Sequence, residues 1–581
     1  IDEIIIEPVA TNLTPGVHTA EIVASRGWDQ WALNGFSVGY TPPQNRLSGP
    51  LQLVGGMLLV LSLVMMTQVE WHKIRPPFGS WFEQLSNQRQ LLFTGATAVI
   101  VALSGWLTWG EQASGIYRRL GETGQLTLTA AVASLFYVTP TLYIYVIALV
   151  ILFGLIYFRP SWGLALVAVC FPLYVPPLAK PILNYRFSPT EVFMLVTFAA
   201  VLLRTYAGRL QGVKERQEPL ISMPKLLRVD WLVLLFTAVA TASLFVTDRL
   251  DVATNEYRVV IIEPVLFYIT MRLVKPSKAE LWLIFEAFLL GGILVAGYGF
   301  WQYASGSDEL ITAEGGLLRI RSFYGSPNNV GLYLGRILPL LTALILLGSS
   351  SLKKRKWSYS AIWLLTAVVT LLTFSRGAIL LGLPAAMLFV FWQWQKQNGR
   401  KTWPWVAVGG ITAVIGLILL LQVPQLAGRF DLRGQTSFFR LALWQASWQM
   451  FLDHPWLGVG LDNFLYAYRG EYILNAAWQE PDLNHPHNIF LDFATRLGLL
   501  GLISGGLLFI SLGQSLKANL AKLDGKWWAL TVGMIGTLID ILFHGLVDHS
   551  FFLVDLAFVF MWLLATAVTL QEKRPLGNHV K

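Results

Sequence analysis

The stretch from Gly428 to Leu500 reads GRFDLRGQTSFFRLALWQASWQMFLDHPWLGVGLDNFLYAYRGEYILNAAWQEPDLNHPHNIFLDFATRLGLL. It is polar and rich in Trp, and its polar part closes with Asn484-His485-Pro486-His487-Asn488. Long apolar segments lie on both sides of this polar part. Apolar runs of about 18 or more residues recur along most of the chain, and each can cross roughly 30 Å of hydrocarbon as a helix. The polar stretch interrupts this series of apolar runs, and we therefore expect it to carry the functional residues.

Composition predicts an all-α polytopic membrane protein. The chain has 581 residues, of which 55% are hydrophobic and 13% charged, against about 25% charged in soluble domains. The net charge of +9 does not indicate a nucleic-acid partner, because Lys and Arg concentrate in short loops, where they set orientation and favour anionic headgroups. The single cysteine, Cys170, permits no intrachain disulfide and no Cys-based metal site. Because the sequence begins at Ile1 without Met or a signal peptide, we interpret it as a fragment or a processed chain.

We expect about 13–15 transmembrane helices from the number of apolar runs. The stretch from Leu126 to Phe158 is too long for one upright helix, and we interpret its first part as interfacial or re-entrant. The expected spans lie near 51–69, 91–109, 137–158, 162–178, 189–205, 230–247, 258–273, 280–302, 328–348, 358–374, 377–394, 404–421, 489–514, 527–546 and 551–570.

Five regions follow from this pattern. Residues 1–48 contain short strand-like runs broken by Thr14-Pro15-Gly16 and Asn34-Gly35, which predict a small external β-rich segment. Residues 49–187 form N-terminal transmembrane helices, 188–421 a transmembrane core, 422–487 a large external catalytic loop, and 488–581 the last transmembrane helices with a cytoplasmic tail. Cytoplasmic loops carry the excess of Lys and Arg, and the basic groups from 214 to 228, 353 to 356, 396 to 401, 517 to 526 and 573 to 574 all fall on the face opposite the 422–487 loop.

His487 is the best candidate for a catalytic group. It lies one residue before the helix that begins near Asn488, and histidine is the side chain best suited to accept a proton near neutral pH. The competing interpretation is that His485 and His487 only cap and polarise the helix start. Arginines on the same face favour the catalytic interpretation.

Several of these arginines are external. Arg376 lies in Phe374-Ser375-Arg376-Gly377 between two apolar spans, Arg319 and Arg321 precede Gly325-Ser326-Pro327-Asn328, and Arg440 lies in an amphipathic helix predicted on the external surface. Arg376 could simply snorkel to the interface, and Arg440 could lie on a solvated helix face. A guanidinium matches phosphate oxygens bidentately, so several arginines around one histidine indicate a diphosphate leaving group.

Other polar residues allow more than one interpretation. Gly458-Val459-Gly460 predicts a tight backbone turn and not a nucleotide fingerprint, since no strand precedes it. Asp540, His544 and Asp548 share a helix face at i, i+4 and i+8, which favours a hydrogen-bonded structural trio over a metal site or a cavity lining. Glu263 and Glu286 are expensive in a membrane unless they are paired. Arg258 is the expected partner of Glu263; unpaired, the carboxylates would suit the proton path of a transporter.

The order of motifs resembles the O-antigen ligase and O-antigen polymerase family of bacterial envelopes. The resemblance covers roughly residues 230–570. It rests on Arg440, Trp444, Asp453-His454-Pro455, Gly458-Val459-Gly460, Asp462-Asn463-Phe464, His487-Asn488 and Arg496-Leu497-Gly498-Leu499-Leu500-Gly501, with Phe374-Ser375-Arg376-Gly377-Ala378 and Gly325-Ser326-Pro327-Asn328 upstream.

The resemblance implies a C-type glycosyltransferase-like fold in the bacterial inner membrane, with the active site facing the periplasm. It implies transfer of a glycan from a polyprenyl-diphosphate donor to a glycan, lipid or protein acceptor, with inversion and with neither a metal nor another cofactor. By motif, His487 would be the base and Arg376, Arg440 and Arg321 would hold the diphosphate. His485, Asn488, Asn328 and Asp462 would support them.

Three features depart from the family pattern: the β-like segment before the first span, the number of spans, and His485 beside the expected histidine. The His-Asn dipeptide favours His487 as the base. The alternative function is a glycolipid or polysaccharide transporter or flippase, in which the arginines bind headgroups without chemistry. We find no internal repeat of the kind typical of transporters, and the acceptor cannot be identified from the residues.

Overall fold

A computed structural model describes residues 115–117, 119–139, 142–175, 180–182, 185–210, 226–312, 316–399 and 435–572, with a few isolated positions. The predicted β-rich segment 1–48 and the spans expected near 51–69, 91–109 and 404–421 lie outside the described residues. The chain divides into two compact units, Ile1–Ile100 and Val101–Lys581. The helices and strands described below all belong to the second unit. The five predicted regions stay predictions.

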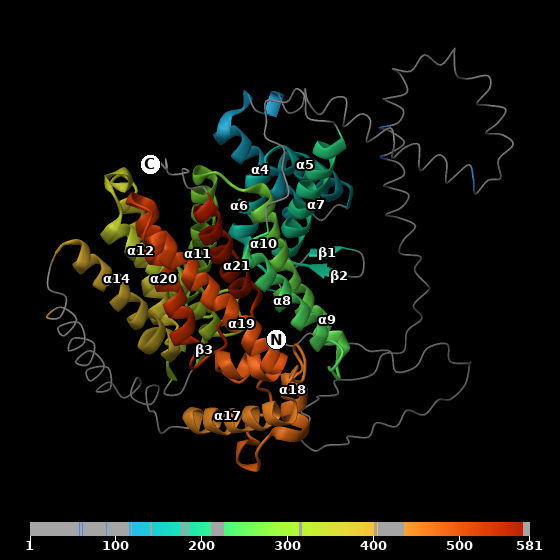
Figure 1. The fold of residues 1–581 in the computed structure, drawn as a ribbon, viewed down its shortest axis with the longest axis vertical. Helices are drawn as coiled ribbons and strands as arrows, with labels where there is room; N and C mark the ends of the chain where they lie inside the picture. The colour runs from blue at the N-terminus through green and yellow to red at the C-terminus, as the bar shows by residue number, and fades with distance from the viewer. Residues whose placement is uncertain are drawn as a thin grey trace, which may run out of the picture. The chain divides into compact units, whose positions relative to one another are not determined.

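The described residues are almost entirely helical (Figure 1), which confirms the all-α membrane class. Two short antiparallel hairpins, β1 with β2 and β3 with β4, interrupt the helices. The elements are α4 (Gly121–Val138), α5 (Leu142–Phe158), α6 (Pro160–Cys170), β1 (Lys180–Ile182), β2 (Tyr185–Phe187), α7 (Pro189–Leu210), α8 (Arg228–Ser243), α9 (Leu250–Glu256), η2 (Tyr257–Ile262), α10 (Glu263–Val274), α11 (Lys278–Ser305), β3 (Ile311–Thr312), β4 (Leu318–Arg319), α12 (Pro327–Leu347), η4 (Ser350–Leu352), α13 (Lys356–Leu372), η5 (Gly377–Gly382), α14 (Leu383–Gln397), α17 (Gln435–Asp453), α18 (Phe464–Ala467), η6 (Tyr468–Tyr472), η7 (Asn475–Ala477), α19 (Ile489–Leu520), α20 (Gly525–His544) and α21 (Val554–Glu572).

Seven of the described helices are long and apolar enough to cross a membrane: α7, α11, α12, η5 with α14, α19, α20 and α21. Each lies where a span is expected; α11, for example, runs from Lys278 to Ser305 against an expected 280–302. The total of about 13–15 crossings stays a prediction, because several expected spans lie outside the described residues.

The region before β1 differs from the expectation. The spans expected near 137–158 and 162–178 form a helix pair, α5 and α6, that bends by 120° across Arg159, as a broken span or a re-entrant loop does. α6 has 11 residues, too few to cross the hydrocarbon alone. Residues 121–138 form a separate helix, α4, which packs against α5.

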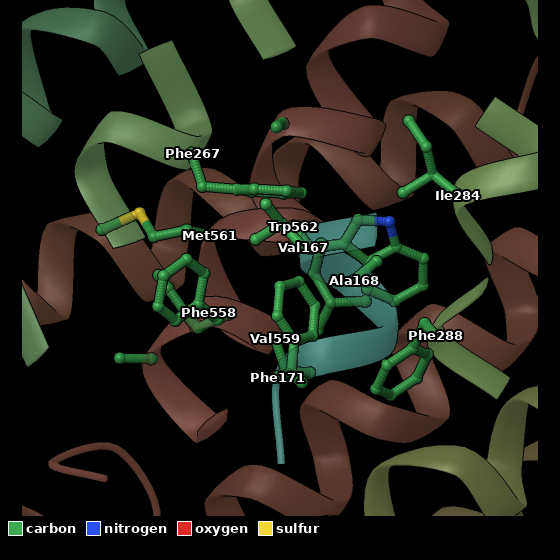
Figure 2. Close-up of a cluster of buried hydrophobic side chains, with 14 of the residues drawn as sticks. Val167, Ala168, Phe171, Phe267, Ile284, Phe288, Phe558, Val559, Met561 and Trp562 are labelled. Carbon is green, nitrogen blue, oxygen red and sulfur yellow. The ribbon is translucent and has the colours of Figure 1, made fainter. Parts of the chain in front are cut away.

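α21 lies inside the bundle with side chains buried around its whole circumference. A helix that is apolar on every side is stable only when protein or lipid surrounds it, and here protein does. Figure 2 shows Phe558 and Trp562 among side chains of α6, α10 and α11. The ring of Phe171 stacks on Phe558 at 5.2 Å, and Phe288 meets Trp562 at 5.0 Å.

The packing of α12 against α20 positions the end of the bundle that carries the histidines. Gly533 and Gly536 on α20 face Leu340 and Pro339 on α12, and a Cβ at either glycine would meet them closer than ordinary van der Waals contact. Small residues let membrane helices approach closely. The seam also buries an ion pair between Arg336 of α12 and Asp540 of α20.

Basic residues gather at the other end of the bundle. Arg355, just before α13, forms an ion pair with Glu286 of α11, and the Lys526 ammonium lies 4.4 Å from the ring centroid of Trp282. Gly525 lies beside Ser349, so the α12–α13 and α19–α20 connections meet there. The His487 end of α19 is opposite, as expected from the charge pattern.

α19 contains a break at Gly498, where φ is +64° and the backbone leaves helical geometry. The amides of Leu499 and Leu500 donate to the carbonyls of Pro455 and Trp456, at 2.7 and 3.3 Å. Gly458, with φ at +67°, packs against the carbonyl of Thr495. The tight turn predicted at Gly458-Val459-Gly460 is confirmed, because both glycines have a positive φ. This turn packs against the break in α19.

Replacing Gly498 by Ala is expected to lower the free energy of unfolding by about 1–3 kcal/mol, because a Cβ there would need a positive φ and would overlap the Trp456 backbone. Gly506→Ala is the matched control: it lies on the same helix with no atom within 4 Å of the added Cβ, and Ala in a helix interior is favoured by about 0.5–1 kcal/mol. Denaturation of the two variants in detergent would measure the difference. Equal stabilities would contradict this account of the break.

Candidate functional site

The start of α19 positions His487. The side chain of Asn488 accepts hydrogen bonds from the amides of Phe490 and Leu491 at 3.0 and 3.1 Å, which is a standard helix N-cap. The Asn488 amide also donates to the carbonyl of Leu546, so the cap is tied to the chain that follows α20. His487 precedes the cap with φ at +47°, a region that non-glycine residues seldom adopt outside functional sites.

Asp548 contacts both histidines of the motif. His487 Nδ1 lies 3.0 Å from Asp548 Oδ1 and 3.0 Å from His485 Nε2. His485 Nε2 lies 3.7 Å from the same carboxylate oxygen. The His487 side chain is 18% exposed and Asp548 only 3%. The carboxylate is therefore inside the protein while the imidazole of His487 reaches its surface.

The hydrogen bonds assign the tautomers, which the heavy atoms alone do not. His485 Nδ1 lies 2.5 Å from Asn484 Oδ1, an acceptor, so this nitrogen carries the proton and Nε2 has a lone pair. His487 Nδ1 faces that lone pair and the Asp548 carboxylate, so it must be the donor. In the neutral imidazole, the Nε2 of His487 therefore has the lone pair and can accept a proton.

A third histidine completes the cluster. The ring of His549 stacks on His485 with centroids 3.6 Å apart, and its Nε2 lies 3.3 Å from Asn329 Oδ1. Burial lowers the pKa of His485 well below its ordinary value and lowers the pKa of His549 to about 4. Burial opposes ionisation of Asp548, but its contacts with His485 and His487 outweigh it and hold the pKa of the carboxyl well below its usual range. The cluster thus contains a carboxylate anion beside two imidazoles, His485 and His549, whose protonation burial disfavours.

His485, Asp548 and His549 also bring metal-ligand atoms within 4.8 Å of one another. The lone pair of an imidazole nitrogen lies in the plane of its ring. The rings of His485 and His549 are parallel within 5°, so one ion cannot lie in both ring planes. This arrangement does not fit a shared metal ion without rotation of a ring.

Arg440 is brought to the same end of the molecule by α17. Four residues later, Trp444 Nε1 donates to the carbonyl of Pro486 at 2.9 Å, which joins the helix to the His485–His487 segment. The Nε of Arg440 is buried and has no hydrogen-bond partner among the described residues. Arg440 thus has an Nε without such a partner on the helix that contacts the histidine segment.

Arg321 and Arg376 lie at the same end. The Nε of Arg321 is likewise buried without a hydrogen-bond partner in the described ranges, and its neighbour Ile320 donates its amide to the carbonyl of Leu372 at 3.2 Å. Arg376 lies two residues after Phe374, whose φ is +48°, and directly before Gly377. A Cβ on Gly377 would overlap the ring of His544, so Arg376 also lies near the end of α20.

Asn328 and Asp462 were also expected at the site, and the structure places them as follows. Asn328 Oδ1 accepts from Arg319 at 2.9 Å, while Arg319 Nε donates to the carbonyl of Thr373 at 2.7 Å. Asp462 lies in the turn after the glycines with φ at +49°, and burial raises the pKa of its carboxyl. Their part in chemistry, like that of Asn488, stays a prediction.

Arg496, which had no predicted role, makes hydrogen bonds to three other residues of the site region. Its Nε donates to Asp492 at 2.7 Å, its Nη1 to both oxygens of Glu256 at 2.5 Å, and its Nη2 to the carbonyl of Asn484 at 3.2 Å. The i, i+4 spacing of Asp492 and Arg496 inside an apolar helix was an available signal. The link to Glu256 could not be read from sequence.

The predicted trio of Asp540, His544 and Asp548 is wrong. α20 ends at His544, so Asp548 lies beyond the helix and the i+8 spacing does not apply. Asp540 pairs with Arg336, and both ring nitrogens of His544 are buried without a hydrogen-bond partner among the described residues.

The intramembrane carboxylates are paired, as the sequence analysis required for a structural role. Arg258 lies 3.8 Å from Glu263 and also forms an ion pair with Glu191, which confirms the expected partner. Glu286 pairs with Arg355 and accepts from Trp282 at 3.0 Å.

Comparison with known proteins gives one match. Residues 361–504 match the family model described as O-antigen ligase. This range contains Arg376, Arg440 and His487, and it ends before Asp548. No curated protein matches the chain.

We expect stability to fall as the pH falls from about 6.5, the ordinary pKa of histidine, to about 4, the lowered pKa of His549. In this window the unfolded chain binds a proton that the folded protein does not, so acid favours unfolding. Thermal unfolding of the wild type and His549→Asn between pH 4 and pH 7.5 would test this, and the variant should show a shallower slope. His454→Asn, at an exposed position just after α17, should keep the wild-type slope; an unchanged slope for His549→Asn would contradict the assignment.

Proposed function

We propose that this membrane protein, which carries an O-antigen ligase family domain at residues 361–504, transfers a glycan from a polyprenyl-diphosphate carrier to an acceptor hydroxyl. The reaction takes place on the external face of the bacterial inner membrane. The observation that carries the proposal is the His487–Asp548 pair at the same end of the bundle as Arg440 and Arg321, whose buried Nε atoms have no hydrogen-bond partner among the described residues. Glycan transfer of the O-antigen ligase type is the chemistry of the matched family, and the steps below are our own proposal for this chain.

His487 is the general base in this proposal. Its Nδ1–H is held by Asp548 at 3.0 Å, which leaves Nε2 to take the proton of the acceptor hydroxyl. Asp548 also stabilises the imidazolium that forms, since its own low pKa keeps it anionic. His485 is the weaker candidate for the base, because its Nε2 already faces His487 and its pKa is lowered by burial.

The leaving group accounts for the arginines. The acceptor oxygen attacks the anomeric carbon, the bond from that carbon to the diphosphate breaks, and the electron pair leaves with the diphosphate. The Nε atoms of Arg440 and Arg321 are buried without a hydrogen-bond partner in the part of the chain that the structure describes, and with Arg376 these arginines would neutralise the departing charge. Direct attack inverts the anomeric carbon. In this proposal the arginines take the place that a divalent cation has in metal-dependent transferases.

The transporter alternative needs intramembrane carboxylates that can couple protons. Glu286 is ion-paired with Arg355, and Arg258 lies 3.8 Å from Glu263, whose oxygens have no hydrogen-bond partner among the described residues. We favour the transferase because Arg440 and Arg321, each with an Nε that has no such partner, lie at the end of the bundle that carries the histidines.

His487→Ala is expected to lower kcat for glycan transfer by about 10²–10⁴-fold, the usual contribution of a general base. Asp548→Asn should also lower kcat, because an amide cannot hold the Nδ1–H tautomer in the same way. The measurement is transfer from lipid-linked donor to acceptor in reconstituted vesicles, with binding of the donor measured separately. His454→Ala is the matched control, since this histidine lies in the same loop and is exposed. Normal transfer by His487→Ala would remove His487 from the mechanism.

Arg440→Ala should weaken binding of the lipid diphosphate by about tenfold or more, because a hydrogen bond to a charged group contributes about 1.5–3 kcal/mol. Arg440→Lys should recover part of the affinity, since lysine keeps the charge and loses the planar fork. Binding to undecaprenyl diphosphate in nanodiscs measures both effects. Arg469→Ala, which removes a loop arginine paired with Asp482, should bind like the wild type. Unchanged affinity in Arg440→Ala would exclude Arg440 from the donor site.

A further inference from the structure

The outward face of α17 is apolar and has no partner within the described residues. Phe438, Leu441, Trp448 and Leu452 are 49%, 64%, 53% and 51% exposed. They lie on one side of the helix, because their spacings are close to whole turns of 3.6 residues. We call these four residues the outer stripe.

The opposite face of α17 is apolar as well. Phe439, Leu443, Ala446 and Met450 are buried and pack with η6, η7 and the loop that leads to the histidines. A helix in water keeps one face polar, and a helix that is apolar on both faces needs cover on both. The outer stripe therefore needs something apolar against it.

The end of the stripe continues into the surface of a membrane span. After α17 the chain reaches Trp456, which is 65% exposed and whose carbonyl accepts from the amide of Leu500 at 3.3 Å. Leu499 and Leu500 are 37% and 39% exposed, and Ile503 and Ile510 on the same helix are 51% and 57% exposed. The apolar outside of α19 and the outer stripe thus meet at Trp456.

The break in α19 sets the depth of this meeting point. From Leu499 to Leu520 the helix is about 33 Å long at 1.5 Å per residue, close to the roughly 30 Å of a bilayer core. Trp456 therefore lies where the span begins, and tryptophan is enriched at this boundary. In Figure 1, α17 runs crosswise to α20 at this end of the bundle, as a helix in the membrane surface does.

Charge is consistent with a lipid surface. Between Gln435 and Asp453 the helix has one basic residue, Arg440, which is only half-exposed and has its Nε buried. The exposed polar residues on this side are the uncharged Gln445 and Gln449, and the one acidic residue of the helix, Asp453, is exposed at its last position. A protein partner that bound through charge would find only this carboxylate, at the end of the stripe.

We propose that the outer stripe of α17, together with Trp456, lies in the interfacial region of the outer lipid leaflet. The helix then has one face in lipid and the other against the site. A consequence, which rests on the proposed function, is that Arg440 is held at the depth where the diphosphate of a membrane-embedded carrier lies.

The single buried cysteine, Cys170, makes a clean spin-label experiment possible. In a Cys170→Ala background, single cysteines at Leu441 and Leu452 are labelled with a nitroxide in nanodiscs of phosphatidylethanolamine and phosphatidylglycerol. Collision with oxygen, which partitions into lipid, is compared with collision with a water-soluble nickel chelate. Ile510→Cys on the exposed side of the α19 span is the lipid reference, and Glu471→Cys, exposed on η6, is the water reference.

The labels at Leu441 and Leu452 should show oxygen collision close to the lipid reference and nickel collision several-fold below the water reference. Nickel collision equal to that at Glu471 would overturn the proposal, since the stripe would then face water. Low collision with both reagents would also overturn it, because protein, including a second copy of the chain, would cover the stripe. None of these results depends on glycan transfer, so the lipid face and the proposed function can fail separately.

Discussion

The buried guanidinium of Arg496 is the contact on which the rest of the site depends. It joins Glu256 at the end of α9, Asp492 on its own helix and the carbonyl of Asn484, and it lies over the ring of Phe552. A buried charge is tolerated only when partners surround it, and removing one partner of such a group costs about 3–5 kcal/mol. This one side chain therefore ties α9, α19 and the segment that carries the histidines together, in addition to the contacts of Trp444 with Pro486 and of His487 with Asp548.

A second constraint decides the geometry of His487, the proposed base. Asp548 is 61 positions from His487 and reaches it only because α20 ends at His544 and the chain turns back. The close packing of α20 on α12, which Gly533 and Gly536 permit, fixes the position of α20 and so the point at which the chain turns after His544. Packing far from the reacting atoms thus places the carboxylate within hydrogen-bond distance of the imidazole, which is how a scaffold orients a catalytic group before substrate binds.

The site combines a neutral, proton-accepting cluster with unsatisfied cations. Burial keeps His485 and His549 uncharged, so the positive potential at this end of the molecule comes from arginines. The Nε atoms of Arg440 and Arg321 are buried and have no hydrogen-bond partner within the described ranges, and such groups are costly unless a ligand satisfies them. An anionic diphosphate, held by a carrier in the adjacent leaflet, would do so, and an apolar outer face on α17 would keep the guanidinium at the lipid surface.

The amino-acid sequence by itself determined the membrane class and the positions of the seven long apolar helices, because apolar length is a local property. It predicted His487 and the arginines by motif, and their chemical roles stay predictions. It could not determine that α5 and α6 bend by 120°, that Asn488 caps a helix while Asp548 holds His487, or that Arg496 connects three segments. Those facts depend on which helices pack together, and contacts between residues distant in the chain leave no periodic signal in it.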